Sequence, residues 1–85
     1  MVWTQDTYDE LVDMTKDVMV DLAQIICNNM DLGKSIDQDL DLLEYACNLY
    51  NGLKYGVLIY QDEHFDYLNE QVMILRTRCR KYLNV

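Results

Sequence analysis

Residues 65–83, FDYLNEQVMILRTRCRKYL, carry the most regular apolar pattern in the chain. Their apolar side chains recur at alternating steps of three and four, at Phe65, Leu68, Val72, Leu75, Cys79 and Tyr82. Such steps place side chains on one face of an α-helix. Asp62 can cap the start of this helix, and the four bases near its end interact favourably with the helix dipole. The pattern predicts a helix over about residues 63–83.

The beginning of the chain predicts another helix, over about residues 5–30. The helix can begin at Thr4 or at Thr7. Thr7 and Glu10 have the spacing of a capping box. Gly33 suits a left-handed cap after its last turn. Its apolar residues form one wide stripe, which consists of Tyr8, Leu11, Val12, Val18, Met19, Leu22, Ile25 and Ile26.

The middle of the chain predicts a helix over about residues 36–60. Ser35 and Gln38 have the spacing of a capping box. The main apolar stripe is Ile36, Leu40, Leu43, Cys47 and Tyr50, with Leu42, Ala46, Leu49 and Leu53 beside it. Gly52 and Gly56 leave two interpretations open: the helix ends at Gly52, or it continues at a cost of roughly 1 kcal/mol per Gly relative to Ala. We favour the continuing helix, because a lone strand there would have no partner.

Length and composition limit the architecture. The chain has 85 residues, no Pro and three Gly, and 51% of its residues are hydrophobic. The length favours one domain over residues 1–85, and the apolar content is too high for a disordered acidic tail. We therefore expect an all-α fold, a small antiparallel bundle of three helices. A domain of this size buries about 60–65% of its unfolded surface, so a second copy would add stability.

Charge is distributed unevenly along the chain. The formal net charge is -8, with -12 over residues 1–75 and +4 over residues 76–85. This charge opposes direct binding to nucleic acid, because phosphates are repelled. The basic end either balances the acidic first helix or mediates head-to-tail self-association.

An acidic row on the first helix is the most unusual feature of the sequence. It consists of Asp6, Asp9, Glu10, Asp13, Asp17 and Asp21. Like charges four residues apart repel by about 0.2–0.5 kcal/mol per pair, and Asp is a poor helix former. Two interpretations stay open: a solvated helix face, or a surface that imitates a row of phosphates and docks on a basic protein.

Aromatic residues supply a second set of candidate contacts. Tyr45, Tyr50, Tyr55 and Tyr60 follow one another at steps of five, which spread them around a helix. Some are therefore exposed or buried against a second chain, and Tyr and Trp are enriched at binding hot spots. Trp3 is either packed on the bundle end or an exposed anchor. The candidate aromatic contacts are Trp3, Tyr45, Tyr55 and Tyr60.

Metal and catalytic chemistry find little support in the sequence. The acids around residues 37–41 lack the Gly and Glu of a calcium loop, since Leu42 and Asn48 stand at those positions. Cys27, Cys47 and Cys79 lack zinc-ligand spacing, and we expect small core residues. No glycine-rich phosphate loop or nucleophile motif is present, so we expect no enzyme, no cofactor and no metal.

The sequence also favours a location and a partner class. The start of the chain lacks the pattern of a signal peptide, and no apolar run exceeds four residues, the length of Val57–Tyr60, which is too short for a membrane span. We expect a cytoplasmic protein with reduced cysteines, in the host cytoplasm if it is viral. In composition the chain resembles small accessory proteins of bacteriophages and mobile elements, although no motif carries the resemblance.

These observations lead to a hypothesis about function. We expect a non-enzymatic binding module, an inhibitor or DNA mimic that occupies a basic, nucleic-acid-handling surface of a host protein. The alternative is a structural protein that assembles as a helical homo-oligomer, in which the acids only confer solubility. An antitoxin-like regulatory subunit would use the same binding chemistry.

Overall fold

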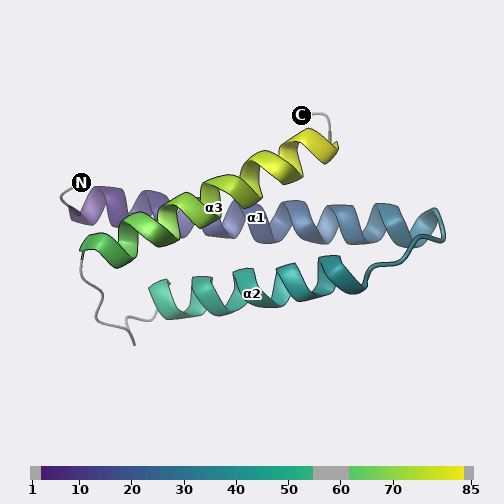
Figure 1. Ribbon diagram of the computed structural model, residues 1–85, viewed down its shortest axis with the longest axis horizontal. Coiled ribbons are helices and arrows are strands. Elements are labelled where there is room, and N and C mark those ends of the chain that lie inside the picture. The colour runs from purple at the N-terminus through teal and green to yellow at the C-terminus, as the bar shows by residue number, and fades with distance from the viewer. Residues whose placement is uncertain (1–2, 55–61, 84–85) are drawn as a thin grey trace.

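Three helices make up the described structure. The computed structural model describes residues 3–54 and 62–83, apart from the side chains of residues 62–64. Helix α1 spans Gln5–Asp31, α2 spans Asp37–Lys54 and α3 spans Asp62–Leu83 (Figure 1). No strand occurs in this part of the chain. The prediction of a small all-α bundle of three helices is confirmed.

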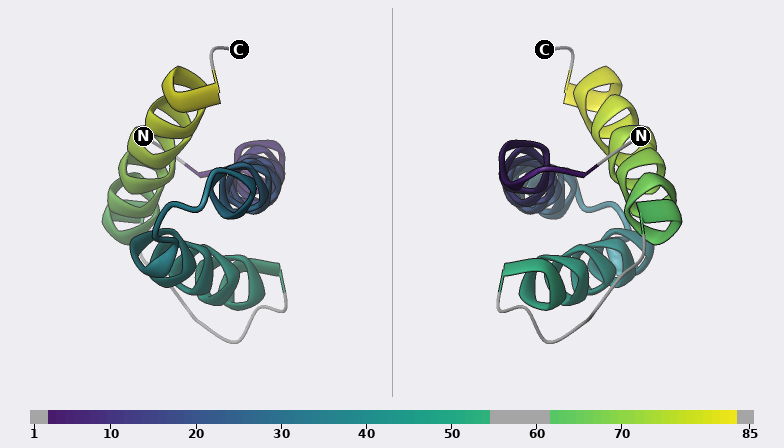
Figure 2. Two further views of the ribbon diagram at one scale, coloured as in Figure 1. Left: turned by 90° about the vertical axis from the view of Figure 1, so that its right-hand side faces the viewer. Right: turned by 90° about the vertical axis from the view of Figure 1, so that its left-hand side faces the viewer.

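Helix α1 is the centre of the bundle. Consecutive helices run in opposite directions (Figure 1). Seen end-on, α2 and α3 form a V that holds α1 (Figure 2). Helix α1 packs against both of its neighbours, whereas α2 and α3 make no comparable backbone approach to each other within the described residues. The bundle is elongated, with principal extents of 43 × 24 × 16 Å.

Local hydrogen bonds explain where α1 begins and ends. Thr4 is the N-cap, and its Oγ1 accepts from the backbone N–H of Thr7 at 3.3 Å. Thr7 Oγ1 accepts in return from the Thr4 N–H at 2.8 Å, so the capping box joins Thr4 to Thr7. Of the two predicted starts, Thr4 is confirmed, whereas the Thr7–Glu10 capping box was wrong, since Thr7 is the third residue of the helix. Gly33 follows the helix with φ of +72°, which confirms the predicted left-handed cap.

The start of α2 differs from its prediction. Asp37 is the first helical residue, and the Leu40 N–H donates to the Ile36 carbonyl at 2.9 Å. Ile36 therefore takes the cap position in place of Ser35. Gly52 lies inside α2, so the helix does not end there. The predicted continuation as far as residue 60 falls on residues 55–61, outside the described residues.

The apolar core forms along α1 and draws side chains from all three helices. Its buried members are Leu11, Val18, Leu22, Ile25, Ala46, Leu53, Leu68, Val72 and Cys79. The stripes predicted for α1 and α3 face this core, except that Tyr82 is exposed. In α2, the row beside the expected stripe is buried, through Ala46 and Leu53, while Leu40 is exposed. Expecting Leu40 in the buried stripe was therefore wrong.

Polar contacts join the segment before α1 to α3, and the C-terminal part of α1 to both of its neighbours. Trp3 Nε1–H donates to Asp66 Oδ1 on α3 at 3.0 Å, and the Trp3 and Phe65 rings lie 5.1 Å apart. Near the other end, the buried Asn29 donates to Asp39 Oδ2 on α2 at 2.9 Å and accepts from the Tyr82 hydroxyl on α3. These contacts join residues of all three helices.

None of the helices described is long and apolar enough to cross a membrane.

Candidate functional site

The predicted acidic row forms an exposed surface on the N-terminal half of α1. We call it the acidic surface, and its exposed members are Asp6, Asp9, Glu10, Asp13 and Asp17. The opposite side of α1 is buried through Leu11, Thr15 and Val18. The core therefore turns these carboxylates away from α2 and α3.

The acidic surface is little neutralised by the rest of the chain. Lys16 is the one base of α1, and no base lies within ion-pair distance of the five carboxylates among the described residues. Asp9 accepts from the Gln5 side chain at 2.9 Å, which leaves its charge in place. From Asp6 to Asp17 the axial distance is about 16 Å. This gives roughly one negative charge every 4 Å, close to the 3.4 Å spacing along one DNA strand.

Asp21 does not belong to the acidic surface, which corrects its predicted place there. Its exposed fraction is 7%, and Arg80 Nε on α3 lies 3.0 Å from Asp21 Oδ2. The two atoms form an ion pair whose N–H does not point closely enough at the oxygen for a hydrogen bond. Helical pitch and the local approach of α3 act together here, because each four-residue step advances about 40° around the axis and Arg80 lies beside this turn of α1. Three steps from Asp9 turn Asp21 about 120°, toward α3.

The predicted aromatic contacts separate into different environments. Trp3 is half-buried and packed on α3, so it is not an exposed anchor. Tyr45 remains 42% exposed on α2. Tyr55 and Tyr60 lie outside the described residues. Tyr67, which is 58% exposed, was missed because it lies off the apolar stripe of α3 and looked like any polar-face residue.

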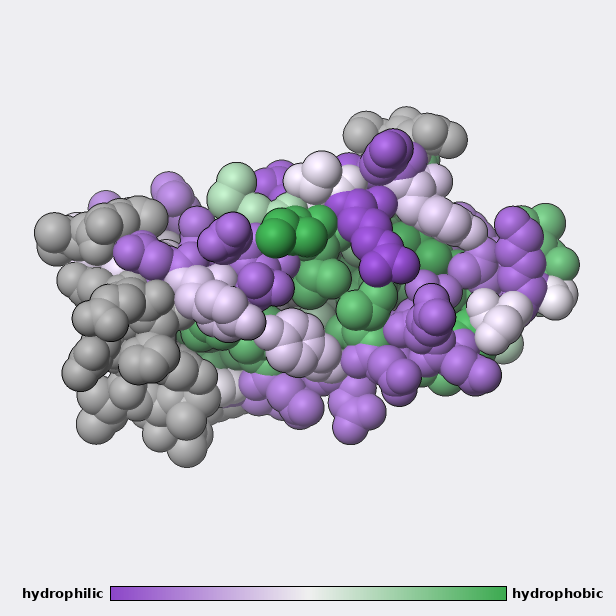
Figure 3. Space-filling view, in the orientation of Figure 1, coloured by the Kyte–Doolittle hydropathy of each residue, from purple (hydrophilic) through white to green (hydrophobic). Residues whose placement is uncertain are grey.

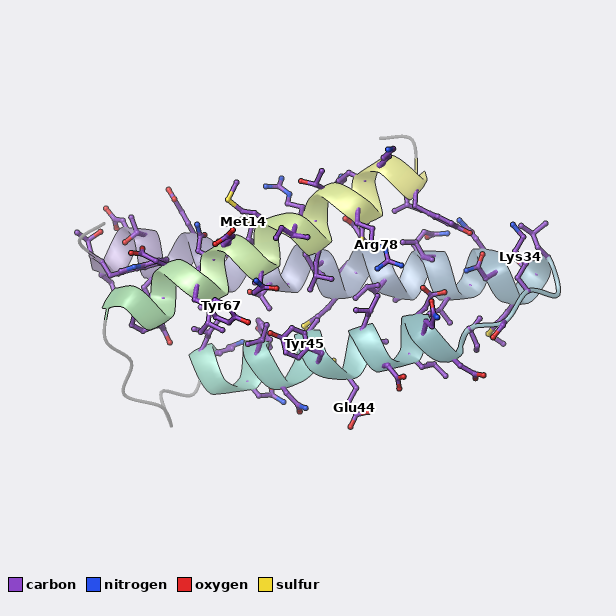
Figure 4. All side chains as sticks on the ribbon, viewed as in Figure 1. Met14, Lys34, Glu44, Tyr45, Tyr67 and Arg78 are labelled. Atoms are coloured by element: carbon purple, nitrogen blue, oxygen red, sulfur yellow. The ribbon has the colours of Figure 1, made fainter. Side chains whose placement is uncertain are left out.

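Side chains fill a strip of surface between α2 and α3, whose backbones make no close approach to each other within the described residues. Figure 4 shows Tyr67 and Arg78 of α3 and Tyr45 of α2 extending into the space between the two helices. Figure 3 shows apolar atoms on this side of the molecule, between the same helices. At one end, a hollow of about 290 Å³ is lined by Gln38, Asp41, Leu42 and Arg78. We call this feature the α2–α3 groove.

The basic end of α3 borders a separate hollow against α1. It has a volume of about 570 Å³ and is lined by Met14, Met73, Arg76, Thr77, Arg80 and Lys81. Arg80, which lines this hollow, forms an ion pair with Asp21 of α1. One base of this basic end therefore pairs with an acid of the first helix, as expected if the basic end balances the charge of that helix. Head-to-tail association stays a prediction.

The three cysteines occupy different environments. Cys79 is buried, Cys47 is half-buried and Cys27 is exposed, so the expectation of a core position was wrong for Cys27. Burial raises the pKa of the Cys79 thiol above its ordinary value of 9.0, and the Asp21 carboxylate adds to the rise. Within the described residues, no three His, Cys, Asp or Glu side chains gather as metal ligands would.

Comparison with known proteins returned no match to this chain among protein-family models, curated proteins or solved structures.

Proposed function

We propose that the chain is a non-enzymatic binding module whose acidic surface docks on a basic surface of another protein. The observation that supports this is the presence of five exposed carboxylates on one half of α1 with no ion-pair partner among the described residues. Such a row costs helix stability through repulsion, and the fold does not offset that cost with bases. Complementary charge on a partner would speed encounter and fix register.

The spacing of the charges favours a particular kind of partner. A surface with about one negative charge every 4 Å suits a protein that binds the phosphates of nucleic acid. The proposal is therefore an inhibitor that occupies such a surface in the cytoplasm of a host cell. The phage or mobile-element origin rests on composition alone.

Capture from a bacterial lysate tests the proposal. The wild-type chain is compared with a variant in which Asp9, Asp13 and Asp17 are changed to Lys. A matched control reverses three exposed acids outside the acidic surface: Asp31, Glu44 and Glu70. Both variants have the same formal charge. We expect a basic nucleic-acid-binding protein to be retained by wild type and control and lost from the acidic-surface variant.

The alternative function, a structural protein that assembles as a homo-oligomer, is supported by a different observation. Large apolar side chains such as Ile74 and Tyr67 are exposed on α3. Under this alternative, neither triple variant changes what the chain captures.

A further inference from the structure

The α2–α3 groove combines exposed apolar and aromatic side chains from two helices. Tyr45 on α2 is 42% exposed, and Tyr67 on α3 is 58% exposed. Leu42 and Leu49 are half-buried members of the core and lie on the groove side of α2. Tyrosine at the centre of an apolar surface is a frequent binding hot spot. The groove thus has the composition of a protein interface.

The packing of the bundle explains why this surface is left open. Helix α1 contacts both neighbours, whereas α2 and α3 make no comparable approach to each other. Helix α1 lies on one side of these two helices, and their opposite sides are covered by no other helix among the described residues (Figure 2). A further helical surface laid along the groove would cover them.

The hollow at one end of the groove is lined by one acid and one base, whereas the whole chain is strongly acidic. Asp41 on α2 and Arg78 on α3 line the same hollow, so they lie at the same level along the bundle. No ion pair joins them within the chain. One acid and one base at one level make this surface complementary to itself.

We propose that the α2–α3 groove is the interface with a second copy of this chain, related by a two-fold axis that runs along the groove. Such an axis keeps each residue at its own level and places α2 of one copy opposite α3 of the other. Asp41 of each copy then faces Arg78 of the other, which makes two ion pairs. A two-fold axis across the groove would set like helices against each other and would lose this pairing.

In the proposed dimer the acidic surfaces of the two copies do not face each other, so their repulsion does not oppose the binding of a second copy at the groove. The acidic residues lie on the side of α1 that is turned away from α2 and α3, so the dimer keeps its two acidic surfaces on opposite outer sides. The proposal does not rest on the binding of a basic partner, because the two surfaces are separate. The small size of the domain adds a reason, since its own core buries limited surface.

Charge exchange between two variants tests the dimer. Asp41→Arg carries two bases in the groove, and Arg78→Asp carries two acids. Sedimentation equilibrium should give twice the chain mass of 10.1 kDa for wild type and the single-chain mass for each variant alone. An equimolar mixture of the two variants should again give the doubled mass, because every cross-contact then joins an acid to a base.

Controls separate this interface from other effects. Arg76→Asp makes the same charge change on an exposed residue of α3 that borders the other hollow, and it should remain dimeric. Tyr67→Asp places a charge at the centre of the groove and should be monomeric, with unchanged helix content by circular dichroism. A monomeric wild type, or two variants that stay monomeric when mixed, would overturn the proposal. So would a dimer that survives either charge reversal.

Discussion

Arg80 Nε on α3 lies 3.0 Å from Asp21 Oδ2 on α1, and this contact divides the acids of the first helix into two groups. The Asp21 side chain is buried, whereas about a third of the Arg80 side chain remains exposed. Asp21 therefore helps to hold α3 on α1, while its neighbours toward the N-terminus face outward. The last acid of the row, Asp21, therefore contributes to the fold, whereas the acids before it remain exposed and can contact a partner.

Removing the partner of a buried carboxylate should destabilise the bundle. We expect Arg80→Ala to lower the free energy of unfolding by about 2–3 kcal/mol, because Asp21 is left buried without its cation. Asp21→Asn keeps the shape without the charge and should cost less, about 1–2 kcal/mol. Urea unfolding followed by circular dichroism measures both. If Arg80→Ala is as stable as wild type, the ion pair does not hold α3.

We expect the side-chain amide of Asn29 to contribute more to the free energy of unfolding than that of the neighbouring Asn28. Asn29 is buried and joins Asp39 on α2 to Tyr82 on α3, so Asn29→Ala removes two contacts between helices. We expect a loss of about 1–2 kcal/mol in the free energy of unfolding. Asn28→Ala is the matched control, because the hydrogen bond of the Asn28 side chain joins it to Gln24 within α1 and not to another helix. Equal losses in the two variants would argue against the bridging role.

The contact of Trp3 with α3 predicts that the N-terminus contributes to stability. Trp3→Phe loses the N–H bond to Asp66 and keeps a ring against Phe65, so we expect a loss of about 1 kcal/mol. Trp3→Ala also loses the ring contact and should cost more. Thermal unfolding of both variants measures this order. Wild-type stability in Trp3→Ala would contradict the packing of this residue on the bundle.

The three thiols should react in order of their exposure. At mildly alkaline pH, about 8, we expect a thiol reagent to modify Cys27 first, then Cys47, and Cys79 only as the chain unfolds. The raised pKa of Cys79 acts in the same direction. Because the unfolded thiol loses its proton at a lower pH than the folded one, stability should fall as pH rises above 9.0. Rapid modification of Cys79 in the folded protein would contradict its burial.

The fold was predictable where one apolar stripe dominates a helix. Leu68, Val72 and Cys79 on α3 and Leu11, Val18 and Leu22 on α1 are buried as their spacing predicted. Helix α2 carries two adjacent apolar rows, and either can face a core. The position of α1 decides between them, and that position cannot be derived from the spacing within α2 alone.

The candidate sites were predictable only in part, for geometric reasons. The four-residue spacing correctly grouped Asp9, Asp13 and Asp17 on an exposed face, but it did not allow for the rotation that buries Asp21. The α2–α3 groove depends on how far two helices stand apart, a distance that no spacing along the chain encodes. Tyr67 becomes a candidate contact residue only because α2 and α3 stand apart.

The affinity of the captured protein for three forms of the chain tests the central claim most directly. Calorimetric titration at low and physiological salt would compare wild type, the triple Lys variant at Asp9, Asp13 and Asp17, and the matched control of equal charge. We predict that the control binds as wild type does, and that the acidic-surface variant binds at least about 100-fold more weakly, a difference of about 2.7 kcal/mol. Equal affinity of the two triple variants would contradict the claim and leave the acidic surface a solvated helix face.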